Sequence, residues 1–297
     1  MPTDPPAAPL PDIHVIGASG RSGSALCRAL SARGQAVVPV VRDRARWQAT
    51  GLPGVARLAD LDDPAALSAA LRDAGVIVST AHARNTARII ASAPPRARLV
   101  LLGSTRKFTR WPDAHGNGVI AGEQALLRSG RDGVMLHPTM IYGAQGENNV
   151  RRLAAWLRRL PVVPLPGGGR ALVQPIHQDD VTRALLAAID HDWRGPHGLV
   201  IAGPEPLAYR DFVIAVAAAF GLPRRRVLDV PASLLLPLAA LTRALPGLPD
   251  IGPAEIRRLL EDKAFDIAPM RAAFGFEPVS LRAGLAAMAS PAASSAP

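Results

Sequence analysis

The feature that most constrains the fold is a glycine-rich loop between an apolar run and a helix-forming stretch near residue 20. The apolar run is Ile13–Ile16, the glycines are Gly17, Gly20 and Gly23, and a second apolar run follows at Ala36–Val41. This order of strand, loop, helix and strand gives the spacing Gly-x-x-Gly-x-x-Gly its meaning. Gly17 permits a tight turn, Gly20 lets the backbone approach a pyrophosphate, and Gly23 lets the helix pack on the strand. The sequence therefore predicts a dinucleotide-binding βαβ unit.

Apolar runs and helical stretches alternate along the first half of the chain. Alternation at this spacing predicts right-handed βαβ units, which give a parallel sheet covered by helices on both faces. We therefore expect a doubly wound α/β fold, in which residues 12–143 form the dinucleotide-binding domain. Its further strands are expected at Val55–Leu58, Val76–Ser79, Leu99–Leu102 and Val134–His137, and its helices at 22–33, 64–73, 84–93 and 118–129.

The second half of the chain has a looser rhythm, because prolines and the run Gly167–Gly169 interrupt it. We expect residues 144–288 to form mainly a smaller α/β region that covers the substrate. Residues 1–11 and 289–297 are rich in Pro, Ala and Ser and are expected to be disordered tails. The uncharged stretch Pro231–Thr242 is too short to span a bilayer, so we interpret it as a buried or lid helix rather than a membrane contact. The other elements expected are strands near 171–176 and 198–202, and helices at 147–160, 178–190, 208–220, 231–245, 253–262 and 280–288.

The basic charge of the chain does not point to a nucleic acid. The formal net charge is +10, but all but two of the 34 basic residues are arginines spread along the chain. Its denser clusters, such as Arg224–Arg226, lack interleaved aromatic side chains for base stacking. Affinity for phosphorylated small molecules is the better explanation. A single cysteine, Cys27, excludes a disulfide framework and a cysteine-based metal site. With no signal peptide or membrane span visible, we expect a cytoplasmic protein without a metal.

Four further segments resemble, in order, motifs of the short-chain dehydrogenase/reductase superfamily. The closest branches are the extended and atypical ones, which include the NAD-dependent epimerase/dehydratases. The resemblance runs from about Ile13 to Leu285 and implies a Rossmann fold, an NAD(P) cofactor and a small-molecule substrate, with a homodimer possible. The segments are Ala59–Leu61, His137–Gly143 (the family's Arg-Pro-x-x-x-Tyr-Gly), Pro175–Val181, and Gly275–Pro278 followed by Gly284–Leu285.

The end of the second strand indicates which cofactor fits. An NAD-preferring site needs a carboxylate there for the ribose 2′-hydroxyl, but the equivalent position is Val41, followed by Arg42. A guanidinium suits the 2′-phosphate of NADP, and Arg21 could add a second charge. Asp43 could instead reach the hydroxyls, although capping a helix that begins at Arg44 is its more ordinary role. We expect NADP, bound by Gly17, Ser19, Gly20, Arg21, Ser22, Gly23, Arg42, Asp60, Leu61, Thr80, Ala81 and Pro138.

The catalytic pattern of the family is only partly present. Its Ser/Thr after the fifth strand is matched by Ser104 and Thr105, with Thr105 in the favoured position. Its Tyr-x-x-x-Lys pair is missing, because alignment places His115 and Val119 at those two positions. Other groups must then do the acid–base work, or the cofactor is bound without being turned over.

Three residues could replace the missing pair, and each has an ordinary structural interpretation as well. His115 could titrate near neutral pH or lie in a polar loop, and Lys107 could act beside Thr105 or be solvated. Tyr142 would line the substrate pocket if the resemblance holds. We expect an NADP-dependent oxidoreductase on a small carbonyl compound. The alternatives are a non-catalytic NADP-binding sensor or accessory subunit, and a nucleotide-sugar epimerase or dehydratase.

Overall fold

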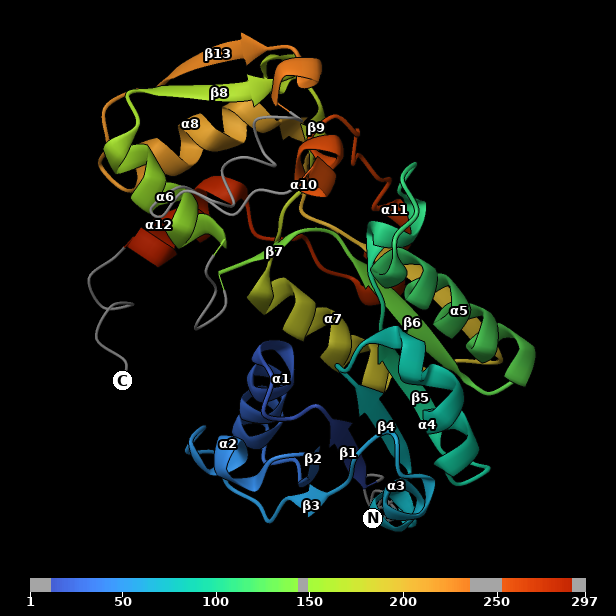
Figure 1. Cartoon of the computed structure of the whole chain (residues 1–297). Coiled ribbons are helices and arrows are strands. Elements are labelled where there is room, and N and C mark those ends of the chain that lie inside the picture. The colour runs from blue at the N-terminus through green and yellow to red at the C-terminus, as the bar shows by residue number, and fades with distance from the viewer. Residues whose placement is uncertain (1–11, 144–148, 236–252, 290–297) are drawn as a thin grey trace, which may run out of the picture. The chain divides into compact units, whose positions relative to one another are not determined.

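The computed structural model describes residues 12–143, 149–235 and 253–289 (Figure 1). The chain divides into two compact units, each assembled from several segments. The first unit consists of Met1–Gly103, Ile120–Leu136 and Leu185–Gly198, and the second of Ser104–Val119, His137–Ala184 and Leu199–Pro297. The tails expected at residues 1–11 and 289–297 lie outside the described residues, except Ala289, which ends a helix. Most of the stretch interpreted as a buried or lid helix also lies outside them.

A seven-stranded sheet with the order β11-β6-β5-β4-β1-β2-β3 is the main element of the fold. Strand β1 pairs in parallel with β2 and β4, so that Ile13 lies opposite Val37 on one side and Val76 on the other. The doubly wound α/β fold that the sequence predicts is thereby confirmed. The strands are β1 Ile13–Ile16, β2 Val37–Val41, β3 Arg57–Leu58, β4 Val76–Ser79, β5 Arg98–Leu102, β6 Gly133–Pro138 and β11 Pro196–Ile201.

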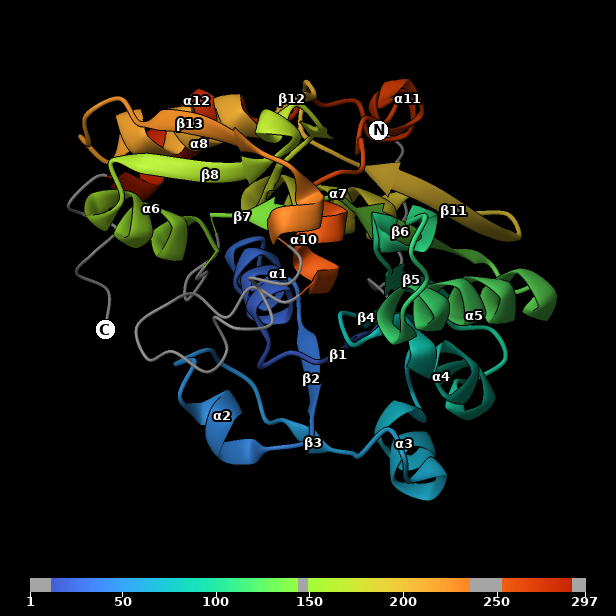
Figure 2. The same cartoon turned by 45° about the horizontal axis from the view of Figure 1, so that its top comes forward.

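Helices lie on both sides of this sheet. In Figure 2, α1 lies on one side of β1 and β2, and α3 and α4 lie on the other. Every residue of β1 and β4 is buried, as expected for parallel strands covered on both faces. These helices are α1 Arg21–Ala32, α2 Arg44–Gln48, α3 Pro64–Leu71, the 3-10 turn η1 Ala83–Asn85, α4 Thr86–Ser92 and α5 Ala114–Ser129.

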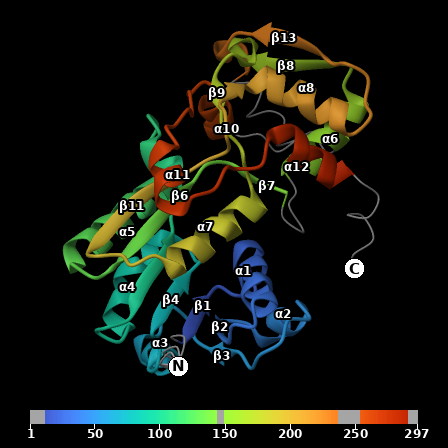
Figure 3. The same cartoon turned by 180° about the vertical axis from the view of Figure 1, so that it is seen from behind.

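The second unit has its own apolar core, in which α6, α8 and α12 gather (Figure 3). Leu157, Phe212, Val216 and Leu285 are among the residues buried there. Its elements are η2 Thr105–Phe108, β7 Ile141–Tyr142, α6 Asn149–Arg159, β8 Val162–Pro166, η3 Gly167–Gly169, β9 Leu172–Val173, β10 Ile176–His177, α7 Gln178–Asp190, β12 Leu207–Ala208, α8 Tyr209–Ala219, β13 Arg226–Val230, α10 Pro253–Arg258, α11 Ala268–Phe274 and α12 Leu281–Ala289.

Two features of the strands differ from the sequence expectation. The sheet expected from residues 12–143 takes its seventh strand, β11, from residues 196–201. The parallel pair β8 and β13 was not expected, because β8 contains Pro164 and Pro166. Proline is tolerated in a strand whose N–H side needs no ladder partner, and β8 belongs to a two-stranded sheet. None of the helices in the described part of the chain is long and apolar enough to cross a membrane.

Candidate functional site

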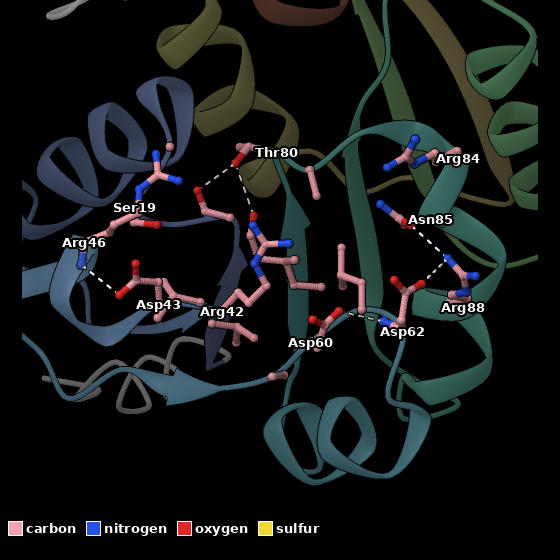
Figure 4. Close-up of a pocket in the computed structure, with 18 residues that line it drawn as sticks. Ser19, Arg42, Asp43, Arg46, Asp60, Asp62, Thr80, Arg84, Asn85 and Arg88 are labelled. Atoms are coloured by element: carbon pink, nitrogen blue, oxygen red, sulfur yellow. Dashed lines mark hydrogen bonds and ion pairs between the residues drawn. The ribbon is translucent and has the colours of Figure 1, made fainter. Parts of the chain in front are cut away.

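The glycine loop after β1 has a shape that larger residues could not adopt. Gly17 has φ +78°, and its N–H donates to the carbonyl oxygen of Val40 at 3.0 Å. A Cβ atom on Gly23 would lie 2.2 Å from the carbonyl oxygen of Gly17, so the first turn of α1 can pack on the loop only through glycine. The Thr80 hydroxyl, at the end of β4, lies 3.1 Å from the carbonyl oxygen of Ile16 and can donate to it (Figure 4). The loop is thus fixed from both neighbouring strands.

The N-terminus of α1 fits the pyrophosphate that the sequence predicts there. Its N-cap residue Gly20 is extended and offers no side chain to the first N–H groups of the helix. The first turn contains no acidic residue. The free N–H groups and the positive end of the helix dipole therefore favour an anion at this point.

A cavity of about 730 Å³ opens beside this loop within the first unit. A volume of this size is typical of small-molecule and cofactor sites. Of the expected cofactor residues, Gly17, Ser19, Gly20, Arg42, Asp60, Leu61, Thr80 and Ala81 line it. Arg21, Ser22 and Gly23 are the first residues of α1 and do not line the cavity, and Pro138 belongs to the second unit.

One end of the cavity, after β2, is basic. Asp43 is the N-cap of α2, and one of its carboxylate oxygens accepts the N–H groups of Ala45 at 2.9 Å and Arg46 at 3.2 Å. The predicted capping role of Asp43 is confirmed. Arg42 and Arg46 both line the cavity (Figure 4), and neither guanidinium forms an ion pair with any residue in the described ranges. The sequence analysis missed Arg46, which lies in α2 just after the cap residue Asp43.

The sequence analysis also missed Arg88, which α4 contributes to the wall of the cavity. Arg88 forms an ion pair with Asp62 at 2.8 Å and donates to the side-chain oxygen of Asn85 at 3.2 Å. Asp60 accepts the N–H of Asp62 at 3.0 Å. Arg88 is thus already paired with a carboxylate, whereas Arg42 and Arg46 offer their charge to a ligand.

In the second unit, the loop that contains the candidate catalytic residues follows β5. Ser104 Oγ accepts the N–H of Arg106 at 3.1 Å. Thr105 Oγ1 instead donates its proton to the carbonyl oxygen of Pro138 at 3.1 Å. A hydroxyl has one proton to give, so the proton of Thr105 is engaged, whereas Ser104 donates to no acceptor among the described residues.

Two other candidate catalytic residues belong to this part of the chain: Lys107 lies in η2, and His115 lies in the helix that follows the loop, α5. The ammonium nitrogen of Lys107 is 3.3 Å from Nε2 of His137, which is completely buried. His115 is exposed on the first turn of α5. Desolvation and the nearby Arg106 guanidinium lower the pKa of His115, against the opposing effect of Asp113. Its imidazole is therefore neutral at neutral pH.

Tyr142 lies in a different environment from the one expected. Only 1% of it is exposed, and its hydroxyl has no hydrogen-bond partner among the described residues. A Cβ atom on Gly284 of α12 would lie 2.3 Å from that hydroxyl, so the ring fills the core of the second unit. Burial, followed by the charge of Asp180, raises the pKa of the phenol. The structure thus places Tyr142 in the core rather than on a pocket wall.

Several known proteins are similar to this chain. Residues 17–117 match a family model described as NAD(P)H-binding. A protein of Sinorhizobium fredii called y4nG is 27% identical over 168 residues, which make up 55% of this chain and only 41% of that protein. A 3-diazoavenalumate denitrifying reductase from a Streptomyces species is 28% identical over 263 residues, covering 75% of this chain and 85% of the reductase.

Solved structures share the fold over nearly the whole chain. The NADPH-dependent quinone oxidoreductase from Escherichia coli, complexed with NADPH, has a TM-score of 0.74 at 19% identity and covers 93% of this chain and 99% of its own. UDP-glucuronic acid 4-epimerase from Bacillus cereus has a TM-score of 0.69 at 18% identity, with 92% and 96% covered. Residues 17–117, which include the glycine loop and most of the residues that line the cavity, thus match an NAD(P)H-binding family model, and the chain shares its fold with these two structures.

Proposed function

We propose that the protein is an NADP-dependent reductase of a small carbonyl compound. The observation that carries the cofactor assignment is the basic end of the cavity, where Asp43 caps a helix while Arg42 and Arg46 remain unpaired within the described residues. Charge-assisted contacts of guanidinium groups suit a phosphate better than a ribose hydroxyl. The similarity to a reductase and to an NADPH-dependent oxidoreductase supports the reaction class.

In this proposal each part of the chain has a separate task. The N–H groups at the start of α1 hold the pyrophosphate, and Arg42 and Arg46 hold the 2′-phosphate. NADPH, when bound, supplies a hydride. Ser104, whose proton is not used within the loop, donates a hydrogen bond to the substrate oxygen and polarises the carbonyl.

The cofactor assignment is tested by calorimetric titration of NADPH and NADH. We expect the wild type to bind NADPH more tightly. Arg42→Ala and Arg46→Ala should each weaken NADPH binding about ten- to hundredfold and leave NADH little changed, because each removes a charged contact of about 1.5–3 kcal/mol. Arg44→Ala is the matched control, since Arg44 is exposed on the same helix but does not line the cavity. Equal or tighter binding of NADH by the wild type would overturn the assignment.

The reaction class is tested by following NADPH oxidation against a panel of aldehydes, ketones, imines and sugar nucleotides. Turnover of a small carbonyl compound supports the proposal, whereas turnover confined to sugar nucleotides favours an epimerase or dehydratase. One observation favours a non-catalytic, cofactor-sensing role instead: the chain lacks a Tyr-x-x-x-Lys pair, and the phenol of Tyr142 is buried. Tight NADPH binding without turnover of any compound would make that role the better explanation.

A further inference from the structure

The loop after β5 contains one of the chain's two lysines, and the end of that lysine meets a buried imidazole. Lys107 Nζ is 3.3 Å from Nε2 of His137, a residue of β6 with no exposed surface. An ammonium group can only donate hydrogen bonds, so Nε2 must accept. His137 also stands where the related motif has an arginine, and a second cation there could not accept from the lysine.

The backbone around Lys107 is held at both ends of the loop. On one side, Thr105 donates to the carbonyl oxygen of Pro138, the residue after His137. On the other side, the buried carboxylate of Glu261 accepts the Thr109 hydroxyl at 2.9 Å and the N–H of Arg110. These contacts fix the backbone position of Lys107. The contact with His137 Nε2 fixes the position of the ammonium group at the end of the flexible side chain.

The other candidate proton donors are less suitable. His115 has a lowered pKa and is neutral at neutral pH, so it has no ready proton to give. Tyr142 is buried in the core, and its pKa is raised. The hydroxyl of Ser104 can polarise a carbonyl, but an aliphatic alcohol is too weak an acid to give up its proton without a base beside it. Lys107 lies on the same loop and is only half-buried, so that solvent can reach it.

We propose that Lys107 delivers the proton in the reduction and that His137 is the positioning residue that holds the Lys107 ammonium in place. This inference rests on the proposed reductase function. The carbonyl carbon gains the hydride that NADPH supplies, and the π electron pair of the C=O bond moves to oxygen. That oxygen takes a proton from Lys107 Nζ, which leaves a neutral amine. The amine then regains a proton from water.

Steady-state kinetics test the catalytic part. Lys107→Met should lower kcat about 100-fold or more, as for loss of a general acid, with the dissociation constant for NADPH unchanged. His137→Leu should lower kcat about tenfold or more without changing that constant, and the double variant should be no worse than Lys107→Met alone. His137→Gln, whose amide oxygen can accept, should recover part of the loss. Additive effects, or a wild-type kcat in either single variant, would overturn the proposal.

A measurement without turnover tests the positioning part. With ¹³C-labelled lysine the protein gives only two Cε signals, from Lys107 and Lys263. His137→Leu should lower the NMR order parameter of the Lys107 Cε, and His137→Gln should restore it. Lys263 is the internal control for folding, because its Nζ donates to the carbonyl oxygen of Arg258 at 2.6 Å. An unchanged Lys107 order parameter in His137→Leu would refute the positioning role.

The two measurements separate the possible failures. If the wild type turns over no panel compound, the proposed function fails, and the catalytic role of Lys107 fails with it. The NMR result then still decides whether His137 holds the lysine. If turnover occurs but Lys107→Met keeps the wild-type kcat, the reductase function stands and the assignment of Lys107 is wrong.

Discussion

Ser104 and Thr105, the two neighbouring hydroxyl residues after β5, differ in whether the hydroxyl proton is already used in a hydrogen bond. Ser104 accepts a backbone N–H and keeps its own proton, whereas Thr105 gives its proton to the carbonyl oxygen of Pro138. The residue favoured by sequence position, Thr105, is therefore the one already engaged within the protein. For a substrate oxygen that needs a donor, Ser104 is the better candidate.

We therefore expect Ser104→Ala to lower kcat about tenfold to hundredfold, with NADPH binding preserved, because the variant loses the carbonyl-polarising donor. Thr105→Val should affect kcat less and lower the free energy of unfolding by about 1 kcal/mol, since it removes one internal hydrogen bond. Steady-state kinetics and urea denaturation of both variants check this. A larger loss of kcat in Thr105→Val than in Ser104→Ala would reverse the assignment.

Gly23 offers a sharp test of the glycine loop. In Gly23→Ala the new methyl group would lie 2.2 Å from the carbonyl oxygen of Gly17, so α1 must move away from the loop. We expect loss of NADPH binding by more than about tenfold, because the helix N–H groups no longer meet the phosphates. Ser24→Ala, on the next residue, is the control, since it removes only a local hydrogen bond to the carbonyl oxygen of Arg21. Calorimetry compares the two variants.

At the residue scale, the sequence predicts local features well and distant ones poorly. The glycine loop and the Asp43 cap depend only on neighbouring residues, and both are found. The environment of Tyr142 depends on packing against Gly284, which lies far along the chain. No local pattern indicates such a contact. The hydrogen bond of the Thr105 hydroxyl likewise depends on Pro138, a residue of another strand.

At the scale of elements, a polar cluster around the buried His14 connects β1 and β3 to the chain after α3. Nε2 of the completely buried His14 lies 3.1 Å from a carboxylate oxygen of Asp73, and Arg57 pairs with the other oxygen at 2.8 Å. Burial lowers the pKa of His14 despite the carboxylate. The hydrogen bond from Arg57 lowers the pKa of Asp73. In both residues, the deprotonated form therefore stabilises the folded protein relative to the unfolded chain.

Stability should accordingly fall on acidification. His14 contributes stability above its unfolded pKa of about 6.5 that is lost as the pH falls through that value and below, because the unfolded chain binds the proton more readily. Asp73 adds a second loss below about pH 4. Urea denaturation between pH 8 and pH 5 measures the first effect, and His14→Gln should flatten the curve. His197→Gln, on an exposed histidine, should leave the slope unchanged. A wild-type stability independent of pH in this range would contradict the prediction.

Among the secondary-structure elements too, those with a clear local pattern were predicted and those that depend on distant contacts were not. Strands β1, β4 and β6 are fully buried and mostly apolar, and the sequence places them to within one residue. The pair β8 and β13 was missed because prolines and arginines hide the strand pattern there. Their pairing depends on tertiary contacts, which the β-propensity of the individual residues does not predict.

At the scale of the whole molecule, cofactor binding should stabilise the fold. A ligand that binds only the native state adds about 2.7 kcal/mol to the free energy of unfolding at a concentration 100 times its dissociation constant. We expect this gain with NADPH in urea denaturation, and a clearly smaller gain in Arg42→Ala at the same NADPH concentration. The absence of any gain with NADPH for the wild type would argue against the cavity as a dinucleotide site.

The seventh strand has a consequence for how the protein is made. The N–H of Gly133 at the start of β6 donates to the carbonyl oxygen of Gly195, and all six residues of β6 are buried. On the ribosome, β6 emerges long before Pro196–Ile201 does. Until then the nascent sheet ends in an unpaired apolar edge, the kind that invites pairing with other chains. The seven-stranded sheet can therefore be completed only after residue 201 has been translated, and in the interval before that the exposed edge of β6 favours aggregation.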